Sequence, residues 1–258
     1  MRRHFILTLL VIICASSSMA QNPNANGLAL LRQAYKAHVP NSAPHDILIT
    51  ADRVVGNGRP ELLKLYVQGS KTMRFETGQG ADQVVSVFGG DDPGWTSRGN
   101  KTQVIPPHVL PQRLTLLPFL DLLTEDNNPS LQIATRESVM LGGRPAYHIV
   151  ALLPDPTQGT KTVGRRFDEI VDFYIDQQTS LVLRSDHQQT TAENMDLRVP
   201  AILEFSDYRM VGGIAIPFRI VETIGMRSTG IRQATITIRS AEVNGGVSPS
   251  LFRKGGGQ

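Results

Sequence analysis

The stretch from Leu203 to Phe252 alternates apolar and polar residues with a period of two, and this pattern most narrows what the chain can fold into. Such alternation is typical of β-strands that keep one face in water. Gly212-Gly213 separates two of the alternating runs, and paired glycines suit a tight hairpin because they adopt positive φ. The alternating apolar residues are Leu203, Phe205, Ile214, Ile216, Phe218, Ile220, Ala234, Ile236 and Ile238. The stretch therefore predicts neighbouring antiparallel strands.

The first 20 residues have the pattern of a secretory signal peptide. Arg2-Arg3 precedes an apolar run from Phe5 to Ile13, and small residues at Ser18 and Ala20 predict cleavage between Ala20 and Gln21. This run is shorter than the roughly 20 apolar residues that span a membrane, and no later segment approaches that length. We expect an exported, periplasmic protein without a transmembrane segment.

The only cysteine, Cys14, lies inside the predicted signal. A lipoprotein is the alternative here, but Ile13 is a poor substitute for the small residue that normally precedes a lipidated cysteine. If the signal is removed, the mature chain has no thiol and no disulfide.

The charge of the chain without its signal argues against a nucleic-acid partner. Without Arg2 and Arg3, 24 basic side chains remain against 23 acidic ones, a net charge of +1, and no basic block suggests nucleic acid. The length suits a single domain, which we expect to cover residues 27–253 after a polar leader at 21–26 and before a flexible tail at 254–258. We expect a monomer.

The remaining pattern predicts one helix, many strands and a helical insertion. Apolar spacing predicts an amphipathic helix from Leu28 to His38, capped by Asn26 and ended by Pro40. Further strands are predicted at 45–55, 62–68, 71–77, 82–88, in a short segment ending near Val104, and at 131–140, 146–153, 167–176 and 181–184, with a polar stretch from there to Pro200. The segment Pro106–Thr124 is leucine-rich, but its prolines predict two short helices instead of one long one.

The fold class expected from these elements is α+β and mainly antiparallel, because too few crossover helices are present for a parallel sheet. A sheet of ten or more strands must curve, and its concave face must be covered. Only the amphipathic helix and the insertion can form that cover.

At this point the chain resembles the periplasmic lipoprotein-carrier (Lol-type) superfamily, whose members carry lipoproteins to the outer membrane. The resemblance rests on the signal, the helix and hairpins that follow it, Gly94-Trp95, the leucine-rich insertion, Phe173-Tyr174-Ile175-Asp176, and the block from Phe205-Ser206-Asp207-Tyr208-Arg209 to Ile216-Pro217. It implies a strongly curved, unclosed half-barrel whose short helices form a lid over an apolar cavity for acyl chains. The loop at 154–166 and the proline-rich insertion depart from the characterised carrier.

The candidate ligand-binding residues follow from the alternation and the insertion. Inward-facing positions are Leu65, Phe75, Val87, Phe173 and Phe205; lid positions are Leu116, Leu117, Phe119, Leu120 and Leu123; Trp95 is expected at the rim. By position alone, Arg53 and Arg74 are candidates for an arginine at the cavity mouth. For each apolar residue, ordinary core packing is the alternative.

The sequence gives little support for catalysis. His38, His45, His108, His148 and His187 are scattered and are expected at surface or half-buried positions, without the spacing of a zinc site. Asp168, Asp172 and Asp176 share one strand face, and Asp91-Asp92 forms an acidic turn, but neither has the spacing of a calcium loop. We expect solvated carboxylates, a structural Asp207-Tyr208 pair, and no metal or cofactor.

Two hypotheses of function remain. The first is a non-enzymatic, exported binding protein for an acyl chain, a lipid or an acylated protein, with outer-membrane lipoprotein sorting as one form of that role. The alternative is a protein-interaction or sensor module of the cell envelope that uses the same fold without a ligand, with a sheet edge or the 154–166 loop as its contact surface. A hydrolase is a third and more distant hypothesis.

Overall fold

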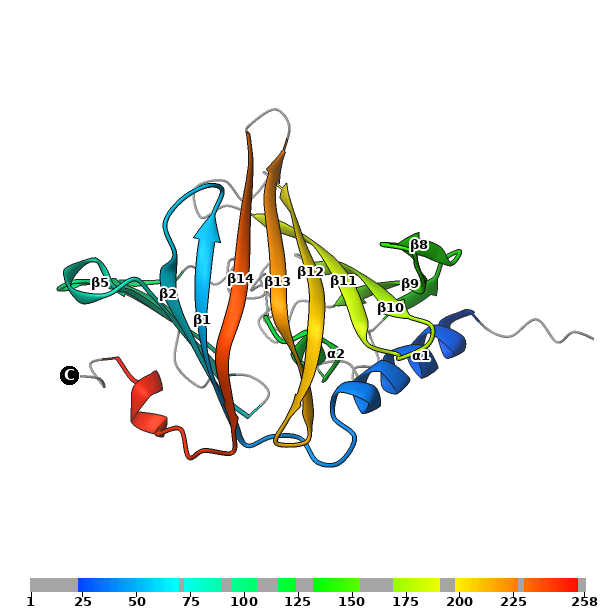
Figure 1. The fold of residues 1–258 in the computed structure, drawn as a ribbon, viewed down its shortest axis with the longest axis horizontal. Helices are drawn as coiled ribbons and strands as arrows, with labels where there is room; N and C mark the ends of the chain where they lie inside the picture. The colour runs from blue at the N-terminus through cyan, green and yellow to red at the C-terminus, as the bar shows by residue number, and fades with distance from the viewer. Residues whose placement is uncertain are drawn as a thin grey trace, which may run out of the picture.

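The computed structural model describes residues 23–69, 72–89, 94–105, 116–123, 132–153, 169–190, 198–226 and 230–254. Within these residues, fourteen strands form one unclosed antiparallel sheet that curves strongly around two helices (Figure 1). The strands are β1 (Asp46–Val55), β2 (Glu61–Gln68), β3 (Thr72–Thr77), β4 (Val84–Phe88), β5 (Trp95–Arg98), β6 (Lys101–Val104), β7 (Gln132–Thr135), β8 (Val139–Leu141), β9 (Arg144–Leu153), β10 (Glu169–Asp176), β11 (Val182–Thr190), β12 (Arg198–Val211), β13 (Ile214–Met226) and β14 (Gly230–Val243). This confirms the predicted fold class.

The strand order places β12, β13 and β14, which contain the alternating residues from Leu203 to Ile238, at the centre of the sheet. The order is β6-β5-β4-β3-β2-β1-β14-β13-β12-β11-β10-β9-β7, with β8 paired to β9 off this path. The predicted hairpin joins β12 to β13 through Gly212 and Gly213, whose φ angles are 54° and 82°. Pro217, which cannot donate to a strand ladder, pairs with Tyr208 next to Asp207, whose φ is 53°.

Several boundaries differ from the sequence prediction. The segment at 95–104 is a hairpin of two strands that turns at Gly99, and the predicted strand at 131–140 is two strands. β11 continues to Thr190 and pairs with β12 as far as Arg198, so Pro200 lies within a strand instead of at the end of a polar stretch. Backbone pairing holds these polar residues in the sheet, and apolar alternation could not reveal it.

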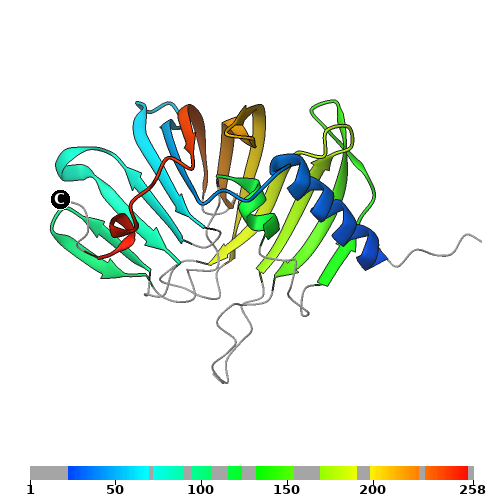
Figure 2. The same ribbon diagram turned by 90° about the horizontal axis from the view of Figure 1, so that it is seen from below.

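Helix α1 (Pro23–His38) crosses from the edge strand β7 to the central strand β13 and packs beside α2 (Pro118–Leu123); Figure 2 shows both helices against the same half of the sheet. α1 begins earlier than predicted, with Pro23 in its first turn, so Asn26 lies inside the helix and does not cap it. α2 is one helix of the predicted pair; the other falls at 106–115, outside the described residues.

His38, the last residue of α1, fastens the helix to two strands. Its Nδ1 lies 3.1 Å from the carbonyl oxygen of Ala215, and the backbone N–H of Val182 donates to Nε2 over 3.2 Å. These partners require a neutral ring with its proton on Nδ1, since Nε2 accepts a hydrogen bond. The ring is fully buried between Phe119 and Tyr208, and burial lowers the pKa of His38 to about 4. The expectation that His38 is half-buried or at the surface is therefore wrong.

This arrangement predicts a loss of stability in acid. As the pH falls from 7 to 4.5, an unfolded His38 binds a proton that the folded one does not, so the free energy of unfolding decreases by about 2 to 3 kcal/mol. Urea unfolding followed by circular dichroism at both pH values measures this loss, and His38→Gln should remove it while lowering stability at pH 7. The exposed His45 supplies the control His45→Gln, which should leave the pH dependence unchanged. An equal acid loss in wild type and His38→Gln would contradict the prediction.

Candidate functional site

The concave face of the sheet is the candidate ligand-binding surface. Directly opposed residues of antiparallel strands place their side chains on one face, so the register assigns each residue to a face. Leu65 pairs with Ile49 and Phe75, Phe173 with Ile149, and Phe205 with Ile220. Leu65, Phe173 and Phe205 are buried in the main apolar core, against which Phe75 packs half-buried. The sequence-based placement of these four residues on the inner face agrees with the register.

The apolar residues continue in rows across the strands. One row contains Ile238, Ala51 and Leu63, the next Ile49, Leu65 and Phe75, and the third Ile47, Val67 and Met73. Phe75 also packs edge-on against Phe88, with ring centroids 5.9 Å apart, and both rings keep partial exposure. Apart from the two phenylalanines, the residues of these rows are almost fully buried within the folded chain, so an aliphatic chain would contact them only where the residues that cover them move aside.

The predicted lid residues pack into the same apolar core as the strands. Leu116, Leu117, Phe119 and Leu120 are all buried within the same core, and so is Leu122, which was not among the predicted lid residues. The side chain of Leu123 falls outside the described part of the structure. α1 and the residues from Leu116 to Leu123 thus form the described lid.

Val87 and Trp95 lie on the other face. Val87 pairs with Arg74 and with Trp95, whereas Phe75, the neighbour of Arg74, points to the concave side. Both residues are buried but stand apart from the main core. The predicted inward orientation of Val87 is therefore wrong, and Trp95 lies on the convex face with it.

Arg74 is also excluded from a concave cavity mouth. Its Nε donates to Glu76 over 2.6 Å, and its Nη1 donates over 2.6 Å to the carbonyl oxygen of Leu251 in the C-terminal 3-10 helix η3 (Pro249–Phe252). This helix covers β3 on the convex side. The guanidinium is therefore buried by the end of the chain.

Arg53, in contrast, belongs to the concave face. It lies directly opposite Glu61 on β2, and its guanidinium reaches over β14 to Glu222 on β13, with an N–O distance of 2.9 Å. The side chains of Arg53 and Glu222 are only 19% and 13% exposed. The ion pair stands where the apolar rows end, so of the two candidate arginines only Arg53 borders the candidate site.

Two polar residues on the concave face were not predicted as site residues. Ser185 and His187 on β11 are 0% and 2% exposed, and His187 Nε2 lies 3.0 Å from Ser185 Oγ. Both residues lie beyond the strand predicted to end at Arg184, and the pairing of Ser185 with Phe173 places them on the concave face. Because His187 is buried, the expectation of a half-buried or surface position fails for this histidine too.

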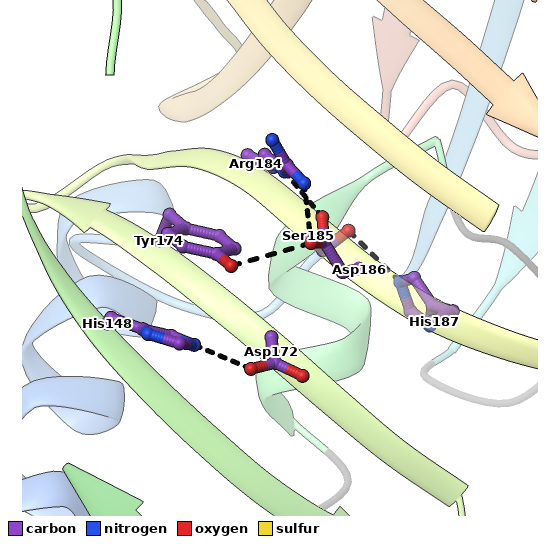
Figure 3. A network of polar contacts seen from close by, with 7 residues as sticks. All are labelled: His148, Asp172, Tyr174, Arg184, Ser185, Asp186 and His187. Atoms are coloured by element: carbon purple, nitrogen blue, oxygen red, sulfur yellow. Dashed lines mark hydrogen bonds and ion pairs between the residues drawn. The ribbon is translucent and has the colours of Figure 1, made fainter. Parts of the chain in front are cut away.

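A network of polar side chains occupies the convex face of β9, β10 and β11 (Figure 3). His148 bonds Asp172 over 2.5 Å and stacks on Tyr174, while Arg184 holds Asp186 with two bonds of 2.5 and 2.7 Å. Each of these charged groups already has a partner, which favours a structural role.

Two further carboxylates, those of Asp176 and Asp207, are structural as well, whereas Asp91, Asp92 and Asp168 lie outside the described residues. Asp176 is 1% exposed, and its Oδ1 accepts bonds from the backbone N–H groups of Gln178 and Thr179, so it shapes a turn and is not solvated as expected. Asp207 pairs with Arg209, and the Tyr208 hydroxyl donates to the Val182 carbonyl. No group of three or more His, Cys, Asp and Glu side chains in the described ranges is placed to hold a metal ion.

A separate pocket of about 620 Å³ lies at the turn between β1 and β2. It is lined by Asp52, Arg53, Val55, Gly58, Arg59, Pro60, Glu61, Leu62, Gly78, Gln79 and Arg239. Asp52 and Arg239, which both line the pocket, form an ion pair with each other. The charged lining does not suit an aliphatic chain.

Comparison of the sequence with known proteins finds no match, whereas comparison of the structure identifies the fold. No protein-family model matches the chain, and no curated protein sequence is similar to it. No helix in the described ranges is long and apolar enough to span a bilayer.

Solved structures match over nearly the whole length. A DUF1329 family protein from Desulfovibrio piger has a TM-score of 0.61 at 16% identity, covering 91% of this chain and 98% of its own. A putative outer membrane lipoprotein-sorting protein domain from Vibrio parahaemolyticus has a TM-score of 0.60 at 13% identity, covering 90% and 98%. A LolA superfamily protein from Nitrosomonas europaea has a TM-score of 0.55 at 11% identity, covering 89% and 98%. The chain therefore shares its fold with these proteins, as the resemblance to the lipoprotein-carrier superfamily predicted.

Proposed function

We propose that the protein is an exported, non-enzymatic binding protein that holds the acyl chain of a lipid or acylated protein against the concave face, beside the half of the sheet that α1 and α2 cover. The observation that carries the proposal is the set of apolar rows on β1, β2, β3 and β14, which ends at the Arg53–Glu222 ion pair. The likeness to a lipoprotein-sorting domain supports this choice over other uses of the fold.

The energetics favour a long chain. Burial of about 15 methylene groups gains roughly 12 kcal/mol at ~0.8 kcal/mol each. Association costs at least about 4 kcal/mol in lost motion. A surplus of about 8 kcal/mol corresponds to micromolar affinity, which suits a carrier that must also release its ligand.

The proposal predicts that wild-type protein carries acyl lipid and that a bulky concave side chain displaces it. Ser86 pairs with Phe75 and Thr96 on the concave face, so Ser86→Trp should lower bound lipid about tenfold by filling space beside Phe75. Native mass spectrometry and lipid extraction of the purified protein measure this. Ser97 pairs with Val85 and Thr102 on the convex face, which makes Ser97→Trp the matched control. A wild-type protein that remains empty when offered acyl lipid would contradict the proposal.

A second prediction concerns the lid. A Cβ atom built on Gly27 would lie 3.5 Å from the Cβ of Ile133 on β7, a separation that a disulfide spans. With both residues replaced by cysteine, the oxidised protein should load acyl lipid at least tenfold more slowly than the reduced protein, because α1 can no longer leave the sheet. Stopped-flow binding of a fluorescent fatty acid, with and without reductant, measures the rates.

The reduced double variant controls for the substitutions themselves, and Ile133→Cys alone controls for the oxidant, whereas Gly27→Cys alone would place its Cβ 2.4 Å from Ile133 Cγ2. If the oxidised double variant loads as fast as the reduced one, ligand does not enter by movement of the start of α1.

A further inference from the structure

We infer that Ser185 and His187 recognise the carbonyl group of an acyl ester or acyl amide, so that the ligand is an ester- or amide-linked acyl chain and not a plain hydrocarbon or an ether lipid. This inference rests on the proposed function and adds to it the chemical group that the concave face selects.

The first argument is the location of the pair. Ser185 lies in a cross-strand row between Phe173 and Leu203, and His187 lies between Val171 and Ala201. These four neighbours are apolar and fully buried. Figure 3 shows the pair on the same strand as Arg184 and Asp186, whose own bonds are made on the convex face. The sheet therefore carries an alcohol and an imidazole into its apolar side.

The second argument is hydrogen-bonding capacity. A serine hydroxyl has one donor and two acceptor sites. With the proton of the His187 ring on Nε2, His187 donates to Ser185 Oγ, and the serine hydroxyl keeps its donor for the carbonyl oxygen of a ligand. A polar group in an apolar environment is costly unless it is hydrogen-bonded, so a ligand that offers a partner gains an advantage over one that does not. An ester or amide carbonyl accepts a hydrogen bond at the first carbon of the acyl chain, whereas a methylene group offers none.

The third argument is the position of the pair relative to the apolar rows. The row of Ser185 continues through Leu203 to Glu222, which is the partner of Arg53. From Arg53 towards the Gly212-Gly213 turn, β1 presents only Ala51, Ile49 and Ile47 to the concave side. Successive rows are about 7 Å apart, which gives the apolar surface a depth of about 20 Å. β1 lies four strands from β11, about 19 Å at the usual spacing of strands, so an acyl chain that begins at Ser185 would cross the concave side of β12, β13 and β14 to reach these rows.

Two lipids that differ only at the carbonyl test the inference. 1-Palmitoylglycerol has an ester at the first carbon of the chain, and 1-O-hexadecylglycerol has an ether in its place. Each competes with the uncharged fluorescent probe N-phenyl-1-naphthylamine for the purified full-length protein. Wild-type protein should prefer the ester by up to about tenfold, the range that one net hydrogen bond provides. Ser185→Ala should bind both lipids equally.

Two further variants separate recognition from packing. Ser97→Ala removes a hydroxyl from the convex face and should keep the preference for the ester. His187→Gln retains a group that can hydrogen-bond Ser185, so it should keep most of the preference. Circular dichroism verifies that each variant is folded, and the wild-type comparison needs no variant at all.

The outcomes distinguish the two proposals. If neither lipid displaces the probe, the proposed acyl-binding function fails. If wild type binds both lipids with equal affinity, or if Ser185→Ala keeps the preference, acyl binding stands and carbonyl recognition at Ser185 is overturned.

Discussion

The pairing of β1 with β14 holds the sheet together. It runs from Ile47 opposite Val243 to Val55 opposite Ala234, and it joins the strands β1–β6 to the strands that follow in the second half of the chain. Without this ladder the apolar rows of β1, β2 and β3 would lose their continuation into β14 and β13. The candidate site therefore depends on contacts between residues almost 200 positions apart, which are costly to form because the intervening chain must be ordered.

Successive residues of a strand point to opposite faces of the sheet, so the alternation decides which residues can border the candidate site. It also explains which of these residues could be predicted from the sequence. In β2, β10 and β12 a clear alternation identified Leu65, Phe173 and Phe205 correctly. The same alternation places Arg74 opposite in phase to Phe75, so it already argued against a concave arginine there. β4 has apolar residues on both faces, at Val85 and Val87 as well as at Val84 and Phe88. The sequence of such a strand does not indicate which of its two faces lies on the concave side of the sheet.

The burial of His38 and His187 could not be predicted from the residues near them in the sequence. His38 is buried because Ala215 and Val182, far along the chain, supply both of its ring partners. His187 is buried because β11 extends through a polar segment that only cross-strand pairing with β12 can order. These contacts are tertiary, so no spacing of residue types near either histidine could have revealed them. The overall sequence of helix, hairpins and insertion was sufficient for the fold, at identities of 11 to 16% to its structural neighbours.

The bond from Arg74 to the Leu251 carbonyl ties the convex face to the very end of the chain. A buried guanidinium that loses a partner is left partly unsatisfied, which is expensive in a region with little water. A chain that stops a few residues early would thus be penalised at β3, 177 positions away from the missing carbonyl. The 3-10 helix η3 thus makes the burial of an arginine on an early strand depend on a residue far along the chain, although η3 contributes nothing to the concave face.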